Sequence, residues 1–87
     1  MQDLATERDH LVLAERHIGE GEDRVARQAD LLERLRGTRR SGQDVASAET
    51  LLGNLRQTLE SWKDHRDTIL ATIARLETER EDPQQLG

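Results

Sequence analysis

Apolar residues recur every seven positions along the first half of the chain. The series is Leu4, Leu11, Ile18, Val25 and Leu32, and the positions three residues later include Ala14, Gly21 and Leu35. Apolar residues spaced by alternating steps of three and four lie on one face of an α-helix. The pattern therefore predicts a long helix over about residues 4–40 with a single apolar seam.

The second half of the chain repeats this pattern more regularly and predicts a second helix over about residues 45–82. Its seam positions are Val45, Ala48, Leu52, Leu55, Leu59, Trp62, Arg66, Ile69, Ile73 and Leu76. We expect Arg66, the one charged member, to carry its guanidinium outward to water. A polar side chain in an apolar seam also helps to fix the register of two helices. We expect this role for Arg66 and for Gln28, which is a polar seam position of the first half and faces Leu52.

Four residues mark the predicted helix ends. Asp3 and Asp44 can cap the two helix starts, because a carboxylate accepts orphan backbone N–H groups. Gly42 can adopt the left-handed conformation that ends a helix, and Pro83 cannot continue one. The predicted turn covers about residues 41–44, and the predicted frayed tail covers residues 83–87.

Two helices of similar length joined by a short turn are expected to pack antiparallel. In the register that we predict, two residues face each other when their numbers sum to 80, as for Ile18 and Trp62. Every seam position of the first helix then meets a seam position of the second. On one flank we expect two pairs of opposite charge, Glu15 with Lys63 and Glu22 with Arg56. The predicted fold is all-α: a single coiled-coil-like, antiparallel two-helix hairpin over residues 1–87.

Two glycines interrupt the first helical pattern in "HIGEGEDR", residues 17–24. Each interior glycine destabilises a helix by about 0.5–1 kcal/mol relative to alanine. Gly21 falls on the seam opposite Leu59, where we expect it to leave room for the ring of Trp62, and Gly19 falls on the outside. We predict a continuous helix, because a phosphate-binding loop needs a preceding strand and further glycines at fixed spacing.

Composition narrows the class of protein. Charged residues make up 36% of the chain and hydrophobic residues 33%, with Trp62 but no Phe, Tyr or Cys. The apolar side chains are too few for a sandwich, a barrel or an α/β fold, and thiolate chemistry is excluded. The longest apolar run, Leu11–Ala14, is far too short to span a membrane, and the N-terminus lacks a signal-peptide layout. We therefore expect a soluble cytoplasmic protein without a cofactor.

The net charge of -5 argues against general binding to nucleic acid or to anionic membranes, since both need a basic surface. Positive charge is nevertheless concentrated at the turn, where a basic tip consists of Arg34, Arg36, Arg39 and Arg40. Cations near the C-terminus of the first helix suit its dipole. An RNA or an acidic partner is the alternative ligand for this tip.

The three histidines are candidate metal ligands. His10 and His17 lie one heptad apart, His65 falls opposite His17, and Glu7 precedes His10 as in the Glu-x-x-His pairs of helical-bundle metal sites. The second helix has no matching pair. Solvated histidines, or a pH-sensitive contact between two imidazoles, are the competing interpretations.

No catalytic residue is predicted. Ser41, Ser47 and Ser61 have no histidine and acid placed to activate them. The seam between two helices also offers no concave pocket for a substrate. We therefore predict a protein that is not an enzyme.

A lone hairpin leaves its seam partly uncovered, and one flank adds Leu31 opposite Leu51 with few charges. A second hairpin laid across this side would close a four-helix bundle, so we predict a homodimer. The predicted function is a protein-interaction module that acts as adaptor, scaffold or regulator. Its interface comprises Leu11, Ile18, Val25, Leu31, Leu32, Leu35, Leu51, Leu52, Leu55, Leu59, Trp62, Ile69 and Ile73.

Two segments are similar to short, uncharacterised bacterial helical-hairpin proteins. They are "AERHIGEGEDRVARQ", residues 14–28, and "LLGNLRQTLESWKDHRDTIL", residues 51–70. The resemblance covers most of the chain and implies the hairpin fold. It implies no activity, cofactor or functional residue.

Overall fold

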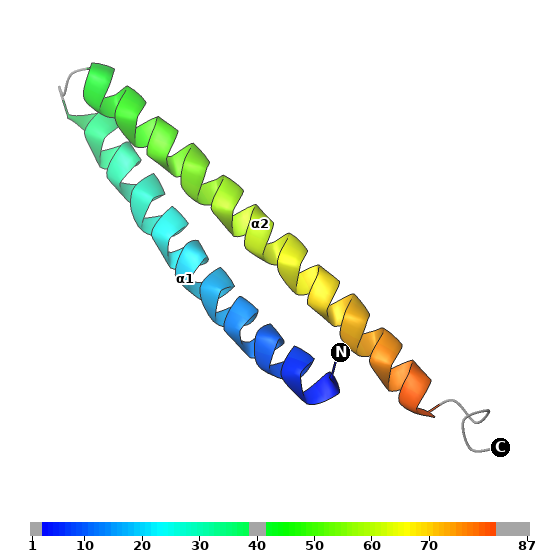
Figure 1. The fold of residues 1–87 in the computed structure, drawn as a ribbon. Helices are drawn as coiled ribbons and strands as arrows, with labels where there is room; N and C mark the ends of the chain where they lie inside the picture. Colours follow the sequence, from blue (N-terminus) through cyan, green and yellow to red (C-terminus); the bar gives the residue numbers. More distant parts are fainter. Residues whose placement is uncertain (1–2, 39–41, 82–87) are drawn as a thin grey trace.

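The computed structural model describes residues 3–38 and 42–81, which form two long antiparallel helices packed side by side (Figure 1). Helix α1 spans Leu4–Gly37 and helix α2 spans Gly42–Glu81. The molecule is a rod of 73 × 18 × 15 Å. The predicted all-helical hairpin is confirmed, and the described residues contain no strand.

Helix α1 starts where predicted but ends about three residues early. Asp3 occupies the N-cap position, yet its carboxylate caps no backbone N–H and instead accepts a hydrogen bond from the Thr6 hydroxyl at 3.2 Å. At the other end, Thr38 is extended, and its backbone N–H and its hydroxyl both donate to the carbonyl of Leu35. These two bonds satisfy a terminal carbonyl, so the helix stops at Gly37 and not near residue 40.

Helix α2 begins at Gly42, about three residues earlier than predicted. No described glycine has a positive φ, so the left-handed turn expected at Gly42 is wrong. Asp44 lies in the first turn of α2 and not at its N-cap. A carboxylate in this turn is favourable because the N-terminal end of the helix dipole is positive. Pro83 and the predicted tail over residues 83–87 lie outside the described residues.

The glycine segment is helical throughout, as predicted, and forms no loop. A Cβ placed on Gly21 would lie 3.2 Å from Leu59 Cδ1, which is tighter than ordinary van der Waals contact. Gly21 therefore lets the two helices approach at Leu59. The space that it leaves is filled by Leu59, and not by the ring of Trp62 as expected.

Gly19→Ala should stabilise the protein by about 0.5–1 kcal/mol, because alanine favours a helix interior. A Cβ on Gly19 would meet nothing within 4 Å, and the same is true of Gly53 in α2. Thermal unfolding followed by circular dichroism measures the gain, with Gly53→Ala as the matched substitution in the other helix. A lower melting temperature for both variants would contradict the open surroundings of these two positions.

The core follows the seam in two clusters. Near the free ends, Ala14, Ile69 and Ile73 are buried, and Leu4, Leu11 and Trp62 pack against them. Near the turn, Leu32, Ala48 and Leu52 are buried beneath Val25, Ala29, Leu35 and Val45. Ile18 and Leu59 are also buried, whereas Leu55 is half-buried. No polar side chain is buried among the described residues, so apolar burial is the main stabilising term.

The seam follows the predicted register. Gly21 faces Leu59, and Leu32 shares a cluster with Ala48, so both pairs of numbers sum to 80. One hydrogen bond between the helices supports this register near the turn. Gln28 Nε2 donates to the Ala48 carbonyl oxygen at 3.1 Å, whereas the sequence analysis placed Gln28 against Leu52.

The flank pairs predicted from the same register are wrong. Among the described residues, Arg8 pairs with Glu77 of the other helix at 3.3 Å and Arg36 pairs with Glu49 at 3.0 Å, and in both pairs the residue numbers sum to 85. Lys63 instead pairs with Glu60 of its own helix. In both predicted pairs the residue numbers sum to 78, seven less than the observed 85, so the prediction was one heptad out of step on this flank.

Arg66 behaves as expected for a cation in an apolar seam. Its guanidinium turns outward and contacts Asp67 Oδ1 through Nη2 at 3.2 Å and through Nε at 3.3 Å. The side chain stays 33% exposed. The charge therefore remains hydrated while the aliphatic stem covers part of the seam.

Candidate interaction surfaces

The hairpin has two flanks of different chemistry, one on each side of the seam. The apolar flank carries Leu31 of α1 and Leu51 of α2, and the charged flank carries the Arg8–Glu77 and Arg36–Glu49 ion pairs. The seam itself is filled by contacts between α1 and α2. A partner can therefore reach the flanks and the outer helix faces.

Near the turn, the apolar flank exposes two large side chains side by side. Leu31 is 42% exposed and Leu51 is 48% exposed, and both line a shallow groove together with Leu35 and Ser47. The sequence predicted that Leu31 and Leu51 would face each other, and the structure brings them to the same groove. Clustered exposed leucines are a feature of protein-interaction sites.

Farther from the turn, the apolar flank carries an aromatic contact between the helices. The His17 ring stacks on Trp62 with centroids 4.3 Å apart and planes at 22°. His65 meets the same indole edge-on at 5.7 Å. The predicted register placed His17 opposite His65. In the structure both rings contact Trp62, which the register did not predict. Trp62 is only half-buried, so its ring extends the apolar surface outward from the seam.

A stripe without charged residues runs along α2 on the apolar flank. This uncharged stripe consists of Ser47, Leu51, Asn54, Thr58, Ser61, His65, Thr68 and Thr72, spaced by alternating steps of four and three. The Thr58, Thr68 and Thr72 hydroxyls each donate to the carbonyl four residues earlier, at 3.0–3.2 Å. Because each of these hydroxyls already donates within the helix, contact with a partner through the threonine methyl groups leaves none of the three O–H donors without an acceptor.

Apolar periodicity alone does not reveal this stripe, because seven of its eight members are polar. The detectable signal was the absence of Asp, Glu, Lys and Arg from eight successive positions of one helix face, in a chain with 36% charged residues. Depletion of charge is also what distinguishes the centre of a protein interface from the rest of the surface.

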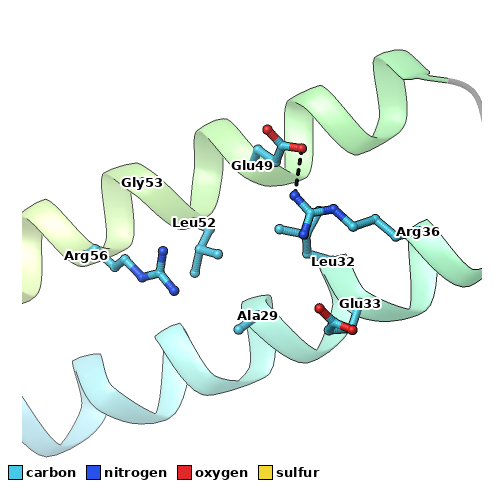
Figure 2. Close-up of a pocket in the computed structure, with 8 residues that line it drawn as sticks. All are labelled: Ala29, Leu32, Glu33, Arg36, Glu49, Leu52, Gly53 and Arg56. Carbon is cyan, nitrogen blue, oxygen red and sulfur yellow. Dashed lines mark hydrogen bonds and ion pairs between the residues drawn. The ribbon is translucent and has the colours of Figure 1, made fainter.

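The charged flank has its own groove between α1 and α2 near the turn (Figure 2). The Arg36–Glu49 ion pair crosses it, and Arg56 extends over it from α2, as Figure 2 shows. Its lining contains two arginines and two glutamates, with Leu32 and Leu52 between them. The charges balance, so the groove has no net charge with which to select an anion or a cation.

The four candidate metal ligands do not come together. Glu7 Oε2 lies 3.8 Å from His10 Nδ1, one turn away on α1, whereas His17 and His65 lie against Trp62. Among the residues that the structure describes, no three His, Cys, Asp or Glu side chains are grouped to hold a metal ion. A metal site usually needs three or four protein ligands around one point.

One serine does share a groove with a histidine. Ser61 and His65, one helical turn apart on α2, line a shallow groove with Thr58 and Trp62. No carboxylate lines this groove, so the acid that orients the histidine in a serine nucleophile's catalytic triad has no counterpart here.

The described part of the basic tip is paired with acids. Arg34 lies 3.8 Å from Asp30, and Arg36 lies 3.0 Å from Glu49. Arg39 and Arg40 lie outside the described residues. Carboxylates beside Arg34 and Arg36 compete with phosphate groups for these guanidiniums, which weakens the case for RNA binding at the tip.

Comparison of the chain with protein-family models, with curated proteins and with solved structures gives no match. The resemblance to short bacterial hairpin proteins therefore stays a prediction. Neither described helix is long and apolar enough to cross a membrane.

Proposed function

We propose that this protein is a non-enzymatic, cytoplasmic protein-interaction module. It self-associates through the apolar flank into a four-helix bundle and acts as an adaptor, scaffold or regulator. The observation that carries this proposal is the pair of exposed leucines, Leu31 and Leu51, in one groove of that flank.

Three further features of this flank support the proposal. The buried seam residues already pack within the hairpin, so the exposed leucines of the flank are available to a second molecule. The flank continues past Trp62 and along the uncharged stripe, which gives it the length of a helix and not of a single pocket. A hairpin laid on this side would cover Leu31, Leu51 and Trp62 together.

Sedimentation equilibrium of the untagged protein tests self-association, at concentrations from about 1 to about 100 µM. We expect twice the chain mass of 9.9 kDa, persisting on dilution. A folded protein that sediments as a monomer throughout this range would overturn the proposal.

The double variant Leu31→Glu/Leu51→Glu should be a monomer that keeps its helical spectrum. Both side chains are already exposed in the hairpin, so the substitutions spare its core but place charge on the flank. Leu70→Glu is the matched control, since Leu70 is 44% exposed and lies with Glu15 and Glu22 on the charged flank. This control should remain a dimer. Loss of the dimer in the control, or its persistence in the double variant, would place the interface elsewhere.

A further inference from the structure

The uncharged stripe suits a copy of itself as partner. The members of two such stripes include no Asp, Glu, Lys or Arg, so their contact brings no like charges together. The three threonine hydroxyls are satisfied within α2, so pairing the stripes breaks none of those hydrogen bonds. From Ser47 to Thr72 the stripe is about 38 Å long at 1.5 Å per residue, which is long enough for an extended helix contact.

The distribution of charge along the hairpin selects the direction of the second copy. Among the described residues, the turn half, residues 28–38 and 42–56, contains three arginines and four carboxylates. The free-end segments, residues 3–14 and 66–81, contain four arginines and seven carboxylates and are therefore the more acidic part. A parallel arrangement would place the two acidic ends side by side, whereas an antiparallel arrangement places each beside the turn half of the other copy. Like charges at close range are destabilising, so charge favours the antiparallel arrangement.

We propose that the partner at the apolar flank is a second copy placed antiparallel, with the uncharged stripe of one α2 against that of the other. This inference rests on the self-association proposed above and specifies its geometry. A two-fold axis crosses the stripe at its midpoint, between Thr58 and Ser61. Ser47 of one copy then lies near Thr72 of the other, and the groove that holds Leu51 receives the region around Thr68.

Disulfide cross-linking tests this geometry directly, because the chain has no cysteine of its own. Ser47→Cys and Thr72→Cys are made separately, then oxidised alone and as an equimolar mixture refolded together. We expect a cross-linked dimer in the mixture and almost none in either variant alone, since a disulfide needs Cα atoms about 4.4–6.8 Å apart. Ala74→Cys, exposed on α2 outside the stripe, is the control and should not cross-link in any mixture.

The possible outcomes separate the two proposals. Cross-linking in the mixture alone supports the antiparallel stripe. Efficient cross-linking of Ser47→Cys with itself indicates a parallel dimer and overturns the inference. A protein that sediments as a dimer but cross-links in no combination uses another face, which overturns the inference and leaves self-association intact. If the wild-type protein sediments as a monomer, both the self-association and its antiparallel geometry are wrong.

Discussion

Leu52→Asp should unfold the hairpin. The Leu52 side chain is 5% exposed and sits in the core cluster near the turn. Truncation of such a leucine to alanine typically costs about 2–5 kcal/mol, and an unpaired buried carboxylate adds to that cost. A single apolar core in a chain near this size seldom supplies more than about 3–5 kcal/mol. The far-UV circular dichroism spectrum should therefore lose most of its helical signal.

Gln57→Asp provides the control for Leu52→Asp. It introduces the same side chain into α2 at an exposed position, so the helical signal and a cooperative melt should both be retained. A cooperative melt in Leu52→Asp at neutral pH would contradict the packing described here. The comparison with Leu31→Glu/Leu51→Glu is also informative, because that variant should lose self-association alone, whereas Leu52→Asp should lose self-association and helix together.

The helices and their seam were predictable because a heptad pattern reports directly which side chains meet. Ile18, Leu32 and Leu59 are buried where the pattern placed them. The helix ends were less predictable, because they depend on a few local hydrogen bonds. The Thr38 bonds to Leu35 that end α1 compete with further helical turns by small free energies that a periodic pattern does not contain.

The surface features were harder to predict, for two reasons. The stacking of His17 on Trp62 depends on the side-chain torsions of a ring that leaves the seam, and spacing alone does not fix those torsions. The absence of charge along the α2 stripe can be read from the sequence, but the hydrogen bonds of its threonine hydroxyls depend on side-chain torsions in the folded helix. Sequence periodicity therefore indicated which side chains the helices bury and that Leu31 and Leu51 share a flank, whereas the ring stacking on Trp62 and the threonine hydrogen bonds had to come from the structure.

The combination of Gly21→Leu and Leu59→Ala should be strongly non-additive. Gly21→Leu alone forces a side chain into a gap where even a Cβ lies 3.2 Å from Leu59 Cδ1, and such overpacking typically costs about 1–3 kcal/mol. Leu59→Ala alone leaves a cavity and should cost about 2–5 kcal/mol. In the double variant the new leucine occupies that cavity. Its loss of stability should therefore be smaller than the two single losses together by about 1–2 kcal/mol.

A parallel cycle with Gly19→Leu separates this packing effect from the general preference of leucine for helices. Gly19 is two residues away in the same helix, but nothing lies within 4 Å of a Cβ placed there. Gly19→Leu should gain the same helix propensity and show additivity with Leu59→Ala, since a Cβ at Gly19 makes no contact with Leu59. Both cycles are measured by urea unfolding of six proteins: the wild type, the three single variants and the two double variants that contain Leu59→Ala. Additivity in the Gly21 cycle would mean that Leu59 packs against another residue, and the register in which seam numbers sum to 80 would then be wrong.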